Sequence, residues 1–180
     1  MGRTNNLLIS TALTVLLMIT FGIDPAEADQ GLFIGVEMVF NDIGGELNAG
    51  NAIASGNGGG LTGGYRFNDT FALEASYWVT DHALSGGRSV ELTCAALSVK
   101  ASLPLANSHV EPYLLVGAGK YQFDATRGEG WHYGAGVDIH LFPSLDLTIG
   151  LAKRSIDFGT APAVSAAVTS MEIGLTYRFI

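Results

Sequence analysis

The chain has 180 residues, of which 48% are hydrophobic and only 14% are charged, and its formal net charge is −8. The low charged share excludes a disordered polar chain and argues against a soluble enzyme surface, since soluble proteins contain about 25% charged residues. The acidic balance disfavours a nucleic-acid partner, and the single cysteine, Cys94, excludes an internal disulfide and a multi-cysteine metal site.

The first element is an expected secretory signal peptide at residues 1–28. Arg3 supplies a positive start, residues 7–23 are apolar and uncharged, and Ala26-Glu27-Ala28 fits the small-x-small cleavage rule. Cleavage after Ala28 would leave a mature domain at residues 29–180. A retained membrane anchor is the alternative, but the apolar run is at the short limit for a spanning helix of about 20 residues.

After the signal peptide, apolar residues alternate with polar or small ones. A period of two is typical of strands with one apolar face. In the first such segment, Leu32, Ile34 and Val36 share one face, whereas Gly35 and Glu37 lie on the other. The same pattern predicts strands at 31–40, 60–67, 71–79 and 95–103, and again from Trp131 to Leu141, Leu145 to Leu151 and Met171 to Phe179.

The segment 112–123 is ambiguous, because its apolar residues occupy both parities. Our interpretation places Lys120 on the polar face, which turns Leu114 and Val116 to that side as well. The apolar face then consists of Tyr113, Leu115, Tyr121 and Phe123.

The connections between these eight segments alternate in length. Residues 68–70, 104–109 and 143–144 form short connections, whereas 41–59, 80–89, 124–130 and 155–168 are mostly longer. Short periplasmic turns and longer external loops are typical of bacterial outer-membrane barrels, which cross the bilayer with strands of about ten residues. The sequence therefore predicts an eight-stranded antiparallel up-and-down transmembrane β-barrel with both termini on the periplasmic side.

A soluble ligand-binding barrel would show the same period with its faces exchanged. The polar face here is rich in small residues, which suits a narrow interior, and its charges balance at five of each sign. Buried charges need partners, so we predict a charge network in the lumen formed by Glu37, Arg66, Glu74, Lys100, Lys120, Asp138, Asp146, Arg154, Glu172 and Arg178.

Aromatic residues gather at both ends of the apolar face, as two lipid–water interfaces would require. The expected periplasmic girdle consists of Phe67, Phe71, Tyr113, Tyr177 and Phe179. The expected external girdle consists of Phe40, Tyr77, Tyr121, Phe123, Trp131 and Tyr133. These girdles favour the membrane barrel over the soluble one.

The last segment, Glu172-Ile173-Gly174-Leu175-Thr176-Tyr177-Arg178-Phe179, resembles the terminal insertion signal of the eight-stranded outer-membrane barrels of the outer-membrane protein A, X and W type. The stretch from Gly64 to Asp69 and Glu111-Pro112-Tyr113 also resemble that family's strand ends. The resemblance implies a barrel in the outer membrane of a Gram-negative cell. It also implies that the assembly machinery reads Gly174, Tyr177 and Phe179.

Two groups of residues could carry chemistry. Asp138 and His140 share one face of one segment and could form a carboxylate–histidine dyad, and Asp81, His82 and Ser85 share one expected loop. Lumen polar groups and ordinary loop residues are the simpler interpretations. The His-x-Ser pair of lipid A deacylases is missing from the sequence, and no cysteine–histidine grouping favours zinc. We therefore expect no catalytic residue, metal or cofactor.

The predicted function is non-enzymatic: a monomeric outer-membrane barrel with an envelope-structural or surface-interaction role. The expected partners are outer-membrane lipid, lipopolysaccharide and the assembly machinery, without nucleic acid. A narrow pore for small solutes, which the resemblance to outer-membrane protein W allows, is the alternative, and a lipid A-modifying enzyme is the third reading. The expected external loops are acidic, whereas a heparin-binding adhesin would carry basic loops.

Overall fold

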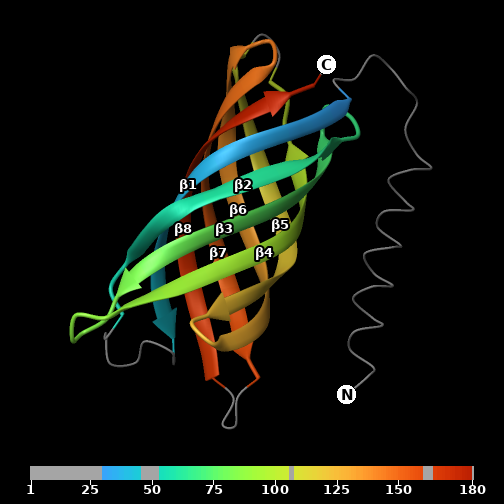
Figure 1. The fold of residues 1–180 in the computed structure, drawn as a ribbon. Coiled ribbons are helices and arrows are strands. Elements are labelled where there is room, and N and C mark those ends of the chain that lie inside the picture. Colours follow the sequence, from blue (N-terminus) through green and yellow to red (C-terminus); the bar gives the residue numbers. More distant parts are fainter. Residues whose placement is uncertain (1–29, 46–52, 106–107, 160–163, 180) are drawn as a thin grey trace, which may run out of the picture.

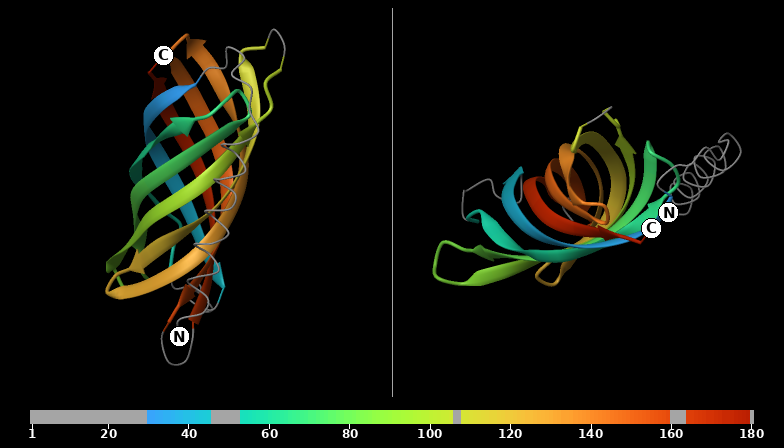
Figure 2. Two further views of the ribbon diagram at one scale, coloured as in Figure 1. Left: turned by 90° about the vertical axis from the view of Figure 1, so that its right-hand side faces the viewer. Right: turned by 90° about the horizontal axis from the view of Figure 1, so that it is seen from above.

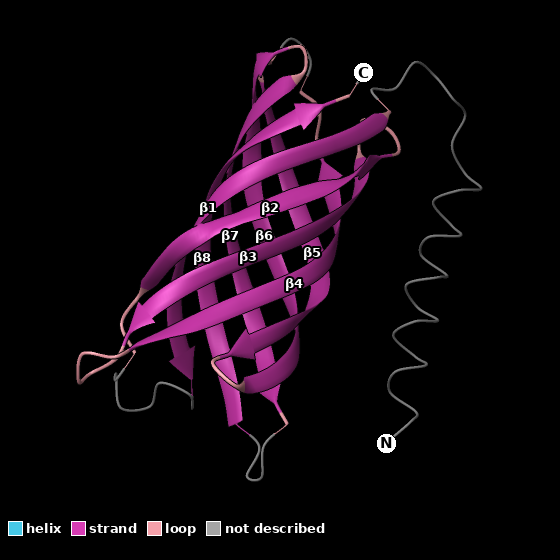
Figure 3. Cartoon of the chain, viewed as in Figure 1, coloured by secondary structure: helices cyan, strands magenta, loops and turns pink. Residues whose placement is uncertain are grey.

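The computed structural model describes residues 30–45, 53–105, 108–159 and 164–179. The expected signal peptide at 1–28 lies outside these residues and stays a prediction. Within these residues every regular element is a strand (Figures 1 and 3). In chain order the strands are β1 (Gly31–Gly45), β2 (Gly56–Arg66), β3 (Phe71–Ala83), β4 (Ser89–Ser102), β5 (Val110–Phe123), β6 (Thr126–Phe142), β7 (Leu145–Phe158) and β8 (Val164–Arg178). No helix in the described part of the chain is long and apolar enough to cross a membrane.

Each strand pairs with its neighbours in sequence, and β8 pairs with β1 to close the sheet into a barrel. All pairs are antiparallel, and closure sets Phe33 opposite Arg178 and Gly45 opposite Ala166. Seen from above, β1 and β8 lie side by side, which completes the closed barrel (Figure 2, right). The predicted closed barrel of eight antiparallel strands is confirmed.

The two ends of the barrel differ. The near end, where β1 begins and β8 ends, carries the connections 67–70, 103–109 and 143–144, and the far end carries those after β1, β3, β5 and β7 (Figure 1). The expected difference in length is not general, because the connection after β5, residues 124–125, is as short as 143–144. Much of 80–89, 124–130 and 155–168, which we expected to be loop, is strand instead. Hydrogen bonding continues there after the lipid-facing alternation stops, so the alternation alone ended these strands too early.

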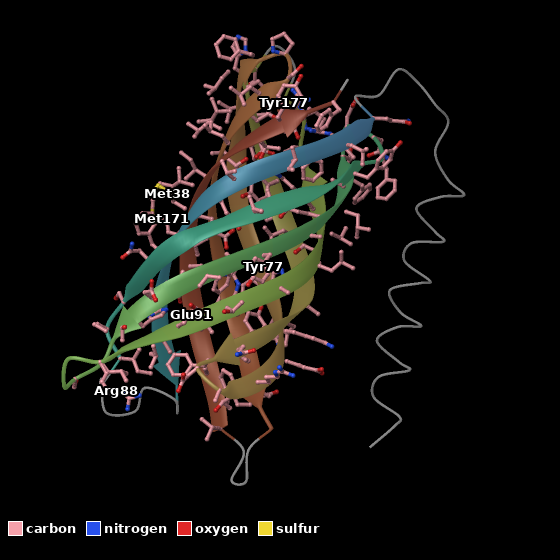
Figure 4. The ribbon with its side chains drawn as sticks, in the orientation of Figure 1. Met38, Tyr77, Arg88, Glu91, Met171 and Tyr177 are labelled. Carbon is pink, nitrogen blue, oxygen red and sulfur yellow. The ribbon has the colours of Figure 1, made fainter. Side chains whose placement is uncertain are left out.

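The outer wall of the near half is apolar. Its large exposed side chains include Leu32, Val36, Leu61, Leu97, Leu114, Leu151 and Leu175. Met38, Tyr77, Met171 and Tyr177 also project from this wall, whereas Arg88 and Glu91 lie at the far end (Figure 4). A contiguous apolar belt is unfavourable in water, so this is the surface that the bilayer covers.

Strand β5 faces the opposite way from our prediction. Tyr113 and Tyr121 are buried inside the barrel, whereas Leu114 and Val116 are exposed on the outer belt. Phe123 packs against the interior core, so neither expected girdle contains the β5 aromatics. The prediction was wrong because both faces of β5 are apolar. Its pairing with β4 and β6 decides which face contacts lipid.

Room for the inward tyrosine comes from glycines. A Cβ on Gly136 would lie 2.5 Å from the Tyr113 ring, and one on Gly150 would lie 2.5 Å from its hydroxyl oxygen. Gly136 is the cross-strand partner of both Tyr113 on β5 and Gly150 on β7. The glycines therefore allow a large ring to lie across two strands in a narrow lumen.

Toward the far end the two faces exchange character. On β7, Leu151 is exposed, but beyond it Ile156 and Phe158 point inward and are buried, while Lys153 and Asp157 point outward. On β1, Phe40 is exposed, whereas Ile43 is buried and Asp42 is exposed. The far part thus has a largely apolar interior and a polar exterior, as a barrel standing in water would have.

Candidate functional site: the lumen of the barrel

The lumen at the near end contains a cluster of ion pairs. Arg66 on β2 lies 2.5 Å from Glu111 on β5, and Arg178 on β8 lies 3.0 Å from Asp146 on β7. His140 on β6 connects the two pairs, because its Nδ1 lies 2.7 Å from Asp146 and its Nε2 lies 3.6 Å from Glu111. Five strands therefore meet through charged side chains at this mouth.

A second pair lies deeper in the lumen. Lys100 Nζ is 2.6 Å from Asp138, and Thr148 donates a hydrogen bond of 2.8 Å to the same carboxylate. Lys100 Nζ also lies 3.9 Å from the centroid of the Tyr113 ring, within the range of a cation–π contact. Lys100 thus contacts both a lumen carboxylate and the Tyr113 ring.

Arg154 is the centre of a third group. It is only 4% exposed and donates hydrogen bonds to Glu172 and Ser170 on β8. Ser170 donates to Asn41 on β1, and Asn41 donates to Thr80 on β3 at 3.0 Å. We call this set, with Glu172 included, the Arg154 network.

The network continues to the far end through His82. Thr80 Oγ1 lies 3.1 Å from His82 Nε2, and His82 Nδ1 donates to the carbonyl of Ala54 at 3.0 Å. His132 lies opposite Arg154 in the register, and its Nε2 is 2.8 Å from Ser98 Oγ. Buried polar groups without partners are costly, so these contacts make a polar path through the interior tolerable.

The polar path is embedded in an apolar core that we call the apolar plug. Its members come from β1, β3, β4, β5, β7 and β8 and from the residues before β2, and all point inward at the far half of the barrel. They are Val39, Ile43, Ile53, Trp78, Leu92, Cys94, Tyr121, Ile156, Phe158, Ala166 and Val168.

Two cavities lie between the near end and the plug. One is lined by Arg66, Glu74, Lys100 and Arg178 among others. The other is lined by Glu37, Glu74, Glu172 and Tyr113 among others. The near half of the lumen is therefore a charged chamber, and the far half is packed.

Nine of the ten residues of the predicted charge network point into the lumen, and Lys120 does not. Lys120 is exposed on the outer wall, because β5 is turned over relative to our interpretation. Glu37 is inside, but among the described residues no hydrogen-bond partner reaches its buried Oε1.

The sequence reasoning missed two interior groups: Glu111 and the plug. Glu111 has the parity of Tyr113, so the same reversal of β5 concealed it. The plug could have been found from the parity switch, since Val90, Leu92 and Cys94 on β4 are even whereas Leu97, Val99 and Ala101 are odd.

The two candidate catalytic groups do not assemble. Asp138 binds Lys100 and Thr148, whereas His140 binds Asp146, so they form no dyad. His82 belongs to strand β3 and is buried inside, whereas Asp81 is exposed on the opposite face. Within the described ranges no group of three or more His, Cys, Asp or Glu residues could hold a metal ion.

Comparison with known proteins gives a family and a fold. A family model described as "Outer membrane protein beta-barrel domain" matches residues 13–179. No curated protein matches the sequence.

Solved structures of outer-membrane barrels are similar at low identity. Neisserial surface protein A has a TM-score of 0.70 at 17% identity, with 83% of this chain and 97% of that chain covered. Ail, the attachment invasion locus protein of Yersinia pestis, has a TM-score of 0.58 at 17% identity, with 83% and 99% covered. OprG of Pseudomonas aeruginosa has a TM-score of 0.56 at 18% identity, with 83% and 96% covered.

Proposed function

Because the chain belongs to the outer membrane protein beta-barrel family, and so lies in the bacterial outer membrane, we propose that it is a closed, non-enzymatic envelope barrel that holds its far end above the membrane. The near end then faces the periplasm and the far end faces outward. The observation that carries this proposal is the apolar plug. A closely packed, largely apolar core leaves no wide path for hydrated ions, and the charge pairs narrow the lumen below it.

A non-enzymatic role is supported by the pairing of the candidate catalytic groups with other partners. The charge network then has a structural role, in which each inward cation neutralises a carboxylate of another strand. We also propose a monomer, exported by the signal peptide at 1–28. In this proposal the assembly machinery reads Gly174, Tyr177 and Phe179, of which Tyr177 and Phe179 are exposed and lie edge to face at 5.1 Å.

Conductance tests the closed lumen. The protein reconstituted in planar bilayers should show no single-channel steps, because the plug fills the far half of the barrel. Steps that recur with each insertion would contradict the proposal. They would favour the narrow pore, for which the charged chamber is the supporting observation.

The accessibility of the single cysteine tests the closed lumen at one defined position. Cys94 lies in the plug at 0% exposure, so a small charged thiol reagent should not modify it in folded protein from either side of a vesicle. Ser155→Cys in a Cys94→Ala background is the matched control, because Ser155 is exposed on the outer face of β7. Rapid modification of Cys94 in the folded barrel would mean that water enters the plug.

The acidic surface of the far end predicts that it does not bind polyanions such as heparin. A structure of Ail is in complex with the heparin analogue sucrose octasulfate. The far end of this chain instead exposes Asp42, Asp81, Glu91, Asp124, Glu129 and Asp157. Like charges repel, so we expect no retention of the folded protein on immobilised heparin at physiological salt. Retention that is lost on adding salt would show that basic groups outweigh this acidic rim.

A further inference from the structure

The sulfur atoms of residues 29–180 lie in two different environments. This part of the chain contains two methionines, Met38 and Met171, and the single cysteine, Cys94. Cys94 lies in the plug at 0% exposure, whereas Met38 is 57% and Met171 is 42% exposed on the outer wall. The two thioethers are therefore the sulfur atoms that a reagent outside the barrel reaches first.

The two methionines are neighbours across the seam between β1 and β8. In the register, Met38 on β1 is opposite Ile173 on β8. Two positions further toward the far end, Phe40 is opposite Met171. Met38 and Met171 thus lie on a diagonal of this strand pair, about 7–8 Å apart at the backbone, which long side chains can bridge. Figure 4 shows them next to each other on the outer wall.

The methionine pair lies where the apolar belt meets the polar wall of the far half. Beyond the pair toward the far end, Asp42 on β1 and Thr169 on β8 are exposed and lie opposite each other. On the near side of the pair, Val36 and Leu175 are exposed and apolar. The two sulfur atoms are therefore at the edge of the hydrocarbon layer, where small uncharged solutes arrive from the water.

We propose that Met38 and Met171 form an oxidation site, at which peroxide converts both thioethers to sulfoxides and thereby weakens the closure of the barrel. Each sulfur attacks one oxygen of a peroxide molecule, so that an S–O bond forms while the O–O bond breaks. The second oxygen takes the proton of the first and leaves as water. The sulfur loses two electrons, and these reduce the peroxide.

Oxidation changes what the seam presents to lipid. A sulfoxide is polar, whereas a thioether is apolar, and a polar group without a hydrogen-bond partner is unfavourable in hydrocarbon. Both sulfoxides would lie on the one strand pair that no turn connects, since β1 and β8 are the first and last strands of the closed sheet. Side-chain contacts across a strand pair contribute to its stability, so their loss at this seam should destabilise the closed barrel.

The test uses the protein refolded into vesicles of saturated phosphatidylcholine and treated with hydrogen peroxide. Intact mass and peptide mapping count the oxygen atoms gained and locate them. We expect the folded barrel to gain two oxygen atoms, one at each methionine, while Cys94 stays unmodified. The oxidised barrel should unfold at a lower urea concentration than the untreated one. After transfer to detergent, methionine sulfoxide reductases for both epimers should restore the original midpoint.

Met38→Leu combined with Met171→Leu is the matched control, because leucine keeps an apolar side chain of similar volume. Its urea midpoint should not change on treatment with peroxide. Val36→Met in this background places a single thioether deeper in the belt. This thioether should oxidise several-fold more slowly than Met38 does in the Met171→Leu variant. A boiled-against-unboiled gel shift verifies that each variant is folded.

Three results would overturn the proposal. The first is oxidation of Cys94 before the methionines, and the second is an unchanged urea midpoint after both sulfoxides have formed. The third is an equal oxidation rate at positions 36 and 38, because the place of the pair at the edge of the belt would then have no effect. None of these measurements depends on conductance, so they are separate from the test of the closed lumen.

Discussion

Replacing Arg154 with alanine should destabilise the barrel by about 3 to 5 kcal/mol, the range for breaking a buried ion pair from one side. Arg154 is buried, and its guanidinium donates to Glu172 and Ser170. Its loss leaves the Glu172 carboxylate inside the lumen without its cation. Urea unfolding of the barrel in lipid vesicles, followed by tryptophan fluorescence, measures the change in the free energy of unfolding.

Two further variants give this prediction its control. Lys153→Ala removes a neighbouring cation that points outward and should change stability by less than about 0.5 kcal/mol. Arg154→Met with Glu172→Gln removes both charges and should recover part of the loss, because neither member of this pair is then left as a lone buried charge. Equal effects of Arg154→Ala and Lys153→Ala would remove the Arg154 network from the explanation of stability.

Replacing Trp78 with alanine should cost about 3 to 5 kcal/mol, because it opens a large cavity in the plug. Trp78 is 1% exposed, and Arg154 lies over its ring at 5.0 Å from the centroid. The loss therefore removes both buried apolar area and a cation–π contact. Far-ultraviolet circular dichroism during urea unfolding measures it without depending on tryptophan emission.

Trp78→Phe separates the effect of lost side-chain volume from the effect of a lost polar group. The Trp78 Nε1 has no hydrogen-bond partner among the described residues, so Trp78→Phe forfeits packing but no hydrogen bond and should cost clearly less than Trp78→Ala. Trp131→Ala is the outer-wall control, since Trp131 is 55% exposed and borders no interior core. A cost at Trp131 as large as that at Trp78 would contradict a packed plug.

Where one parity of a segment is apolar, the sequence alone predicts which residues face out. Val36 on β1, Leu151 on β7 and Leu175 on β8 are exposed as expected, and Glu74, Asp138 and Arg178 point inward. A strand has only two faces, so a clean alternation leaves one arrangement that exposes apolar groups to lipid. The outer-membrane location followed from further features, namely the small residues and balanced charges of the polar face and the aromatic girdles, and the family match confirms it.

Where both parities are apolar, neighbouring strands decide. Tyr113, Tyr121 and Lys120 had the wrong face in our interpretation, because nothing within β5 distinguishes its sides. In the barrel, Tyr113 finds Gly136 across the pair and Gly150 one strand further, and these glycines leave space only on the inner face.

The sequence by itself determined the class of fold, the number of strands and, except at Lys120, which charged residues of the predicted network point inward, because these depend on local periodicity and composition. Only the tertiary structure decided which charges meet, such as Arg154 with Glu172 and Arg66 with Glu111. It also decided that the far half of the lumen is closed. Both depend on the register around the ring, which brings together residues far apart in the sequence, and no single segment encodes that register.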